Sequence, residues 1–198
     1  MLDVRKATTA DASNAGAALA SAFGEDPVFR WMCGKPDTER RMTPFWRHLT
    51  RAGLARPDHE IYVGGDGASV AVWRGIDQWK LSGREVLTGL PASASSLRFR
   101  LPSALKLLTA MEKAHPTDPH YYLEFLGTRR DRQGQGAGSA LMEPMLQRCD
   151  AEGVAAYLES SNPRNVSFYF RHGFVETGVI AAPRNGPKLT TMWREPRT

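Results

Sequence analysis

The chain switches repeatedly between apolar runs of strand length and apolar residues at helical spacing. Strands are predicted at residues 4–7, 60–64, 68–74, 121–128, 155–159, 174–180 and 189–193. Helices are predicted at residues 10–23, 29–32, 44–54, 139–149 and 166–171. Two of the strands flank the sequence GGDG, whose Gly and Asp residues accept positive φ, and this predicts a β-hairpin. Strands mixed with helices along 198 residues indicate an α/β protein with a single domain over residues 1–198.

The pattern changes over about residues 75–119, which read as a helical insertion between two strands. The expected pieces are 86–90, 92–101 and 103–115, separated by Pro91, Pro102 and Pro116. Pro144 lies inside the helix predicted at 139–149, where it should cause a kink. The insertion carries no chemistry of its own in the sequence, so its expected task is to shape a neighbouring site.

The sequence RRDRQGQGAG, residues 129–138, joins a predicted strand directly to a predicted helix. Its glycines at 134, 136 and 138 permit a backbone that turns successive N–H groups to one side. The start of the following helix adds partial positive charge. A strand, a glycine-rich turn and a helix in this order therefore predict a binding site for a phosphate-bearing ligand.

Two common phosphate-binding motifs do not fit this turn. A Walker loop requires Lys followed by Ser or Thr after its last glycine, whereas Gly138 is followed by Ser139 and Ala140. In the dinucleotide fingerprint, Gly134 and Gly136 fit and Glu159 follows at a suitable distance, but Gly138 falls one position early. Too few residues follow Glu159 to build the second half of a doubly wound sheet.

Several motifs occur together at this turn and beyond it: Gln133-x-x-Gly136-x-Gly138 after a strand, Asn162 and Asn165 before Tyr169, and Gly173-Phe174 closing the short helix. As a set they resemble the GNAT superfamily of acetyl-CoA-dependent N-acetyltransferases. The opening VRKATTAD, the hairpin ending AVW and the block ESSNPRN-x-x-FYF-x-HGF resemble its puromycin N-acetyltransferase branch. The resemblance implies a mixed, mostly antiparallel central sheet flanked by helices. It also implies acetyl-CoA as cosubstrate.

The resemblance assigns the coenzyme A pyrophosphate to the backbone amides of the turn and the pantetheine arm to the strand before it. The implied coenzyme-binding residues are Leu126, Gly127, Thr128, Gln133, Gly134, Gln135, Gly136, Ala137, Gly138, Ser139, Asn162, Asn165 and Tyr169. Arg129, Arg130 and Arg132 either add positive charge or form a solvated edge. The two Asn side chains either contact the coenzyme or cap the following helix.

Two catalytic roles follow from the chemistry of an amine attacking a thioester. Tyr169 matches the tyrosine that serves this family as general acid to the departing thiolate. For the base, strand alternation places Tyr122, Glu124 and Leu126 on one face, and Glu124 is the first candidate. A water-relayed proton, a purely structural Glu124, and Glu159 as second candidate remain open. His115, His120 and His172 are weaker candidates because the sequence places none of them near the thioester.

The composition restricts the partners. The net charge of +5, from 26 basic and 21 acidic side chains, favours an anionic ligand, but the chain has no basic block that indicates nucleic acid. Cys33 and Cys149 lack the spacing of a disulfide framework or a zinc site, so no metal is expected. The chain shows neither a signal sequence nor a membrane-spanning run, which predicts a cytoplasmic protein.

The predicted function is acetyl transfer to a primary amine, with a small-molecule acceptor, by direct attack in a ternary complex without an acyl-enzyme. The alternatives are a protein lysine or N-terminal acetyltransferase and a non-catalytic acyl-CoA-binding sensor. Trp31, Phe45 and Trp46 either line an acceptor pocket or pack in the core. The closing strand at 189–193, taken as a free sheet edge, suggests a homodimer.

Overall fold

The fold is built on one seven-stranded sheet. The computed structural model describes residues 3–34, 37–80 and 82–197. The strand order is β1-β2-β3-β4-β5-β7-β6, and every neighbouring pair is antiparallel except β4 with β5. The strands are β1 Val4–Lys6, β2 His59–Gly64, β3 Ser69–Arg74, β4 His120–Thr128, β5 Ala155–Ser160, β6 Val175–Ala181 and β7 Lys188–Arg194. The predicted mixed, mostly antiparallel sheet is confirmed.

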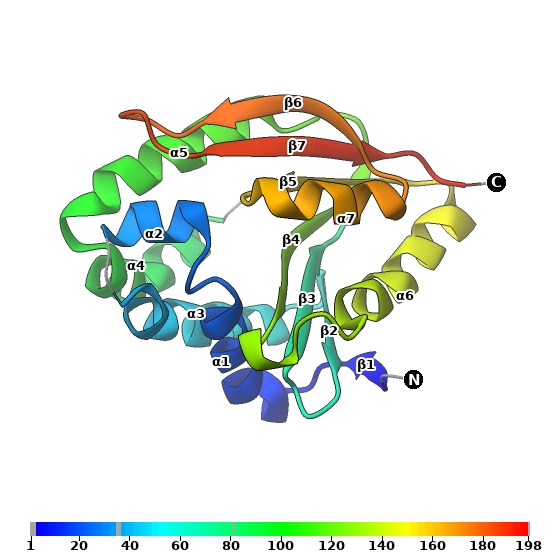
Figure 1. Ribbon diagram of the computed structural model, residues 1–198, viewed down its shortest axis with the longest axis horizontal. Coiled ribbons are helices and arrows are strands. Elements are labelled where there is room, and N and C mark those ends of the chain that lie inside the picture. The colour runs from blue at the N-terminus through cyan, green and yellow to red at the C-terminus, as the bar shows by residue number, and fades with distance from the viewer. Residues whose placement is uncertain (1–2, 35–36, 81, 198) are drawn as a thin grey trace.

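Helices cover both faces of this sheet (Figure 1). They are α1 Ala12–Ala22, α2 Pro27–Cys33, α3 Thr38–Leu54, α4 Gly83–Leu97, α5 Leu101–Ala114, α6 Ala137–Glu152 and α7 Val166–Arg171. One core cluster joins α6 to β3, β4, β5 and β7, and another joins α1 and α3 to the opposite face of β2 and β3. A third, smaller cluster packs α2 and α5 against β6 and β7. In the first two clusters, helices pack on opposite faces of the middle of the sheet.

The helical insertion contains two main helices, and the prediction that Pro91 separates two of its pieces is wrong. Helix α4 continues through Pro91 to Leu97, and a 3-10 turn at Arg98–Arg100 then leads into α5. Pro91 lies on an exposed part of the helix, where water can satisfy the carbonyl that loses its partner. Pro102 lies in the first turn of α5, where a missing N–H costs nothing.

The closing strand β7 is not a sheet edge. It lies between β5 and β6, paired antiparallel with both. The edge on this side is β6, whose Val175 and Val179 are more than half exposed. The prediction of a homodimer therefore loses the reason given for it and stays a prediction.

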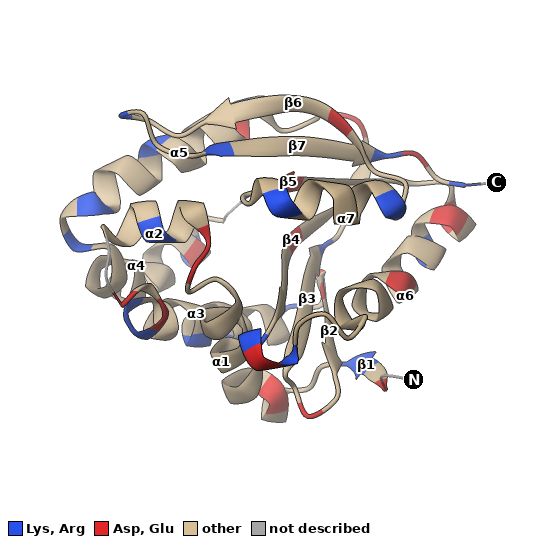
Figure 2. Ribbon diagram, viewed as in Figure 1, with Lys and Arg blue, Asp and Glu red and all other residues tan. Residues whose placement is uncertain are grey.

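Charged residues of both signs are distributed over most helices and strands of the described chain (Figure 2). No helix in the described ranges is long and apolar enough to cross a membrane.

Gly127 in β4 allows α1 to pack closely on the sheet. A Cβ added there would lie 2.8 Å from Cβ of Ala22 and 3.1 Å from Cδ2 of Leu19. We expect Gly127→Ala to lower the free energy of unfolding by about 1–3 kcal/mol, because overpacking a tight core costs this much. Urea titration measures the change. Gly83→Ala is the control, since an added Cβ there meets nothing within 4 Å, and a similar loss in both variants would contradict the packing explanation.

Candidate active site

The strands β4 and β5 separate in the middle of the sheet. Their parallel pairing covers only four residue pairs, from His120 with Ala155 to Leu123 with Leu158. Beyond Leu123, β4 pairs with β3 among the described residues and no longer with β5. The backbone of β4 from 124 to 128 therefore has one side free for hydrogen bonds to a ligand.

A β-bulge lies where the two strands part. Val72 pairs with Phe125 and Trp73 with Leu123, so Glu124 is the extra residue of β4. The bulge interrupts the strand alternation: Leu123 and Leu126 both pack with the cluster of α6, whereas Phe125 packs with the cluster of α1 and α3. The expectation that Tyr122, Glu124 and Leu126 share one face is therefore wrong.

Glu124 forms a buried ion pair with Arg74. Its Oε2 accepts from Nε of Arg74 at 2.8 Å, and its Oε1 accepts from Nη2 at 2.9 Å. Nη1 of Arg74 lies 3.2 Å from Oε1 of Glu85, and that carboxylate also pairs with Arg56. The two carboxylates outweigh burial and raise the pKa of Arg74, which stays protonated. Both oxygens of Glu124 are thus neutralised, a geometry that favours the structural carboxylate over the base.

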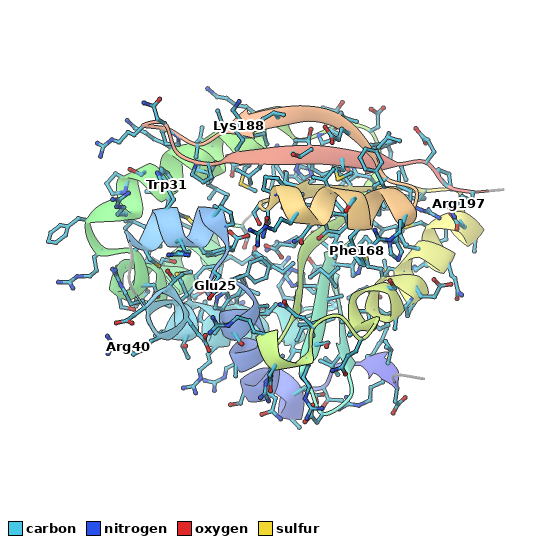
Figure 3. The ribbon with its side chains drawn as sticks, in the orientation of Figure 1. Glu25, Trp31, Arg40, Phe168, Lys188 and Arg197 are labelled. Carbon is cyan, nitrogen blue, oxygen red and sulfur yellow. The ribbon has the colours of Figure 1, made fainter. Side chains whose placement is uncertain are left out.

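The glycine turn has the conformation expected of an anion site. Gly134 and Gly136 adopt φ values of +76° and +81°, and α6 begins immediately after Gly136. No side chain caps this helix start. Gly138 faces the ring of Phe168, 3.1 Å from the position of an added Cβ, and Figure 3 shows Phe168 reaching from α7. The first amides of α6 therefore lie between an exposed turn and the side of α7.

The arginines beside the turn have acidic neighbours, and Figure 2 shows basic and acidic segments alternating along the ribbon before α6. Arg129 pairs with Asp131 at 2.8 Å. Arg130 bridges Glu25 at 2.9 Å and Glu39 at 2.5 Å, which ties the turn to α3 and to the loop after α1. These contacts favour the solvated, structural edge for both arginines.

The segment after β5 contributes the two Asn residues in different ways. Oδ1 of Asn162 accepts from the backbone N–H of Arg164 at 3.1 Å, so it caps the 3-10 turn that leads into α7. Asn165 lines the cavity described below. Asn162 thus has the capping contact that was one of its two predicted roles.

Tyr169 lies on α7 and is 8% exposed. Burial raises the pKa of its hydroxyl, and the nearby carboxylate of Asp26 raises it further. Asp26 caps α2 by accepting from the backbone N–H groups of Val28 and Phe29, and Oδ2 also accepts from Oγ of Ser161. Tyr169 therefore stays protonated at neutral pH, the state that a proton donor requires.

A cavity of about 360 Å³ extends from this point toward the helical insertion. It reaches from β4, β5 and α7 to α4 and α5, and its walls are mostly apolar and aromatic. Characteristic wall residues are Phe29, Phe45, Leu90, Leu101, Leu108 and Met111. Tyr169, Glu124 and Leu126 line the same cavity. The fold thus joins the predicted catalytic residues to a largely apolar pocket.

Only one of the three aromatic residues named from the sequence lines this cavity. Phe45 does so, whereas Trp46 is fully buried among Phe23, Phe29 and Phe125. Trp31 packs with the third core cluster, near α5 (Figure 3). For these two tryptophans, packing in the core is the role that the structure assigns.

The cavity also has polar wall residues that sequence reasoning ranked low. His115, at the end of α5, and Glu159, at the end of β5, lie side by side, with Nδ1 3.6 Å from Oε1. Nε2 of His120, on β4, lies 2.9 Å from Nε2 of His115. His172 lies just after α7, and its Nδ1 is 2.9 Å from the carbonyl oxygen of Phe168. Periodicity could not find this cluster because its members come from three separate elements. In the described ranges, no group of three His, Cys, Asp or Glu residues has an arrangement suited to a metal ion.

Comparison with known proteins identifies the family. A family model described as acetyltransferase (GNAT) family matches residues 105–174. An uncharacterised N-acetyltransferase of Schizosaccharomyces pombe is 31% identical over 203 residues, which cover 95% of this chain and 81% of the relative. The chain belongs to the GNAT family of acetyltransferases.

Solved GNAT structures share the whole fold. A Corynebacterium glutamicum protein, described as histone acetyltransferase HPA2 and related acetyltransferase, superposes with a TM-score of 0.69 at 27% identity. That alignment covers 100% of this chain and 97% of the other. The PaiA N-acetyltransferase of Thermoplasma acidophilum, solved with coenzyme A, superposes with a TM-score of 0.59 at 10% identity, over 98% and 99% of the two chains.

Membership in the GNAT family makes this protein an N-acetyltransferase, and enzymes of this family use acetyl-CoA. The two features that such a coenzyme requires are present: an uncapped helix start behind a glycine turn, and a strand with a free backbone edge. Both features are suited to a coenzyme that carries a pyrophosphate.

The glycine turn allows a matched test. We expect Gly136→Asp to weaken acetyl-CoA binding at least about tenfold, because a carboxylate would be placed beside the amides that are to hold the pyrophosphate. Isothermal titration calorimetry measures the affinity.

Gly153→Asp is the control for backbone strain. Gly153 closes the other end of α6 with φ +68°, and an added Cβ at either glycine meets nothing within 4 Å. Both variants therefore carry similar strain, and equal coenzyme affinity in the two would refute the assignment of the turn.

Proposed function

We propose that this GNAT enzyme transfers the acetyl group of acetyl-CoA to the primary amine of a small molecule with an apolar body. The observation that carries the proposal is the apolar cavity that meets the gap between β4 and β5 beside Tyr169. Residues 1–198 act as one catalytic domain, because α4 and α5 of the insertion complete the wall of this cavity.

The coenzyme follows the free edge of β4. Backbone groups of Leu126, Gly127 and Thr128 hold the pantetheine arm, and the turn from Gln133 to Ser139 holds the pyrophosphate. Support comes from the geometry of β4, which has no β5 partner at these residues, and from the uncapped start of α6. The thioester then lies near the bulge, at the mouth of the cavity.

The acceptor occupies the cavity. Its phenylalanine, leucine and methionine walls favour an apolar group next to the reacting amine. Of the four glutamates on the walls, Glu85 and Glu124 are held by Arg74, which reduces the negative charge available to a basic peptide. Both features favour a small amine over a lysine-rich tail.

A protein substrate remains the second candidate. It is favoured by the 27% identity to the Corynebacterium protein described as related to a histone acetyltransferase. Puromycin-like aminonucleosides remain predicted acceptors on the motif resemblance alone.

The transfer is direct. The thiols of Cys33 and Cys149 are 3% and 0% exposed, and burial raises the pKa of both, that of Cys149 to about 12. Neither is a cavity wall residue, so neither is a nucleophile for an acetyl-enzyme. The amine attacks the thioester carbonyl, and Tyr169 protonates the departing sulfur.

An assay of released coenzyme A thiol against a panel of amines tests the proposal. The panel contains puromycin, 2-phenylethylamine, ethylamine, spermidine and a histone-like peptide. We expect 2-phenylethylamine to exceed ethylamine in kcat/KM by about 10- to 100-fold, since burying a phenyl-sized group contributes about 1.5–3 kcal/mol. A peptide that matches or exceeds every small amine would establish the second candidate instead.

Tyr169→Phe tests the proton donor. We expect kcat to fall by about 10²- to 10⁴-fold, the usual contribution of a positioned acid, with acetyl-CoA affinity within about twofold of the wild type. Tyr62→Phe is the control, because Tyr62 is partly buried on β2 and is not a cavity wall residue. Unchanged kcat in Tyr169→Phe would remove this residue from the mechanism.

A further inference from the structure

Glu159 is a buried carboxylate with an unused oxygen. Its side chain is 2% exposed, and Oε1 has no hydrogen-bond partner among the described residues. It is the first residue of β5 after the last pair with β4, and it lines the cavity. Burying an unpartnered carboxylate oxygen is costly, so its position calls for an explanation.

His115 lies against this oxygen inside an aromatic enclosure. Its ring stacks on Trp79 with centroids 3.8 Å apart and meets the edges of Tyr122 and Tyr157 at 5.0 and 4.8 Å. The side chain is 3% exposed, and Nδ1 is 3.6 Å from Oε1 of Glu159. Packing on three sides leaves the imidazole little freedom to turn away from the carboxylate.

The hydrogen bonds of His120 determine which nitrogen of His115 carries a proton. Nδ1 of His120 lies 2.6 Å from the carbonyl oxygen of Asp118, and a carbonyl only accepts, so this nitrogen donates. Burial lowers the pKa of His120 and favours its neutral form, whose Nε2 is then an acceptor. Nε2 of His115, 2.9 Å away, must be the donor. Nδ1 of neutral His115 is therefore a bare lone pair that faces a bare carboxylate oxygen.

We propose that the pair of His115 and Glu159 is the proton acceptor for the acetyl transfer, an inference that rests on the proposed function. Two acceptors face each other with one proton missing between them. One added proton on Nδ1 turns this repulsive contact into a charge-assisted hydrogen bond between imidazolium and carboxylate. The acceptor amine enters the same cavity as an ammonium ion and must lose a proton before it can attack.

The groups around the pair do not compete for this proton. Burial, the charge of Glu159 and hydrogen bonding to its carboxylate raise the pKa values of Tyr122 and Tyr157, so both phenols stay neutral. On β4, Glu124 is held by two hydrogen bonds from Arg74. Asp77 acts on His120 from a distance and partly opposes the effect of burial on its pKa.

The protons balance over one turnover. The ammonium nitrogen gives one proton to Nδ1 of His115, and the neutral amine forms a C–N bond to the thioester carbon. When the tetrahedral intermediate collapses, the C–S bond breaks and Tyr169 gives its proton to the sulfur. Tyr169 regains a proton from the nitrogen, which has then lost two. The proton held by the pair leaves to solvent with the amide product.

Nitrogen NMR of the ¹⁵N-histidine-labelled protein tests the acceptor without any substrate. We expect His115 at pH 9 to carry its proton on Nε2 and to have a bare Nδ1, as the hydrogen bonds of His120 require. In Glu159→Gln the amide N–H can donate to Nδ1, so this nitrogen should be unprotonated but hydrogen-bonded. The same hydrogen bond should keep the melting temperature of this variant at or above that of the wild type.

The pH dependence of catalysis tests whether the reaction uses the pair. When the pair already holds its proton it cannot accept another, so kcat/KM of the wild type should fall on the acid side. We expect Glu159→Gln to lower kcat by about 10²- to 10⁴-fold, with KM for the amine changed less than about threefold. Its rate should rise about tenfold per pH unit where the wild type is flat, because hydroxide replaces the pair. Glu176→Gln, at an exposed site on β6, is the matched control and should behave as the wild type.

The two measurements separate failure of this inference from failure of the proposed function. A proton on Nδ1 of His115 at pH 9, or an unchanged pH profile in an active Glu159→Gln enzyme, would overturn the inference alone. The expected NMR signature together with no transfer to any amine of the panel would refute the proposed function, and with it the catalytic use of the pair.

Discussion

The separation of β4 from β5 after four residue pairs is the constraint on which the rest of the site depends. A strand inside a sheet normally satisfies its backbone groups on both sides, and β4 does so on one side only beyond Leu123. The gap gives a ligand access to backbone hydrogen bonds in the middle of the fold. Tyr169 of α7 and Leu126 of β4 line the cavity at this gap, and the helix start after the glycine turn lies beside Leu126, so one interruption of the sheet joins the sites proposed for donor and acceptor.

Charge burial divides the site into a fixed part and a reactive part. Arg74 is almost fully buried and binds both Glu124 and Glu85, so every charge in this network has a partner. This network holds the bulge of β4 in place, but neither of its carboxylates is free to accept a proton. The neighbouring Glu159 carboxylate differs, because its Oε1 has no hydrogen-bond partner among the described residues and lies 3.6 Å from Nδ1 of His115. A buried carboxylate with an unpaired oxygen is suited to accept a proton, whereas a carboxylate that is fully paired with arginine is suited to position the backbone.

The helical insertion supplies both apolar lining residues of the cavity and polar residues beside β5. It carries Trp79 and His115, which enclose the end of β5, and its helices α4 and α5 supply much of the apolar lining of the cavity. Variation in such a segment can change the acceptor without disturbing the coenzyme side, since the glycine turn and α6 lie on the other side of β4 (Figure 1).

The sequence by itself determined the elements whose signals are local. The hairpin at GGDG, the strand, glycine turn and helix at 120–152, and the short helix ending in Gly173 depend on periodicity and on positive φ, both of which are properties of neighbouring residues. The motif order in these segments was enough to indicate the GNAT family. The roles of Tyr169 and of the coenzyme-binding residues stay predictions that the geometry accommodates.

Only the tertiary structure decided the features that depend on pairing between distant segments. The bulge at Glu124 arises from the register with β3, and the ion pair with Arg74 joins residues 50 positions apart. The position of β7 between β5 and β6 contradicted a free closing edge, since strand order is not encoded in strand length or periodicity. His115 meets Glu159 only because α5 ends beside the end of β5. Contacts of this kind depend on the packing of the whole chain, and no local sequence pattern predicts them.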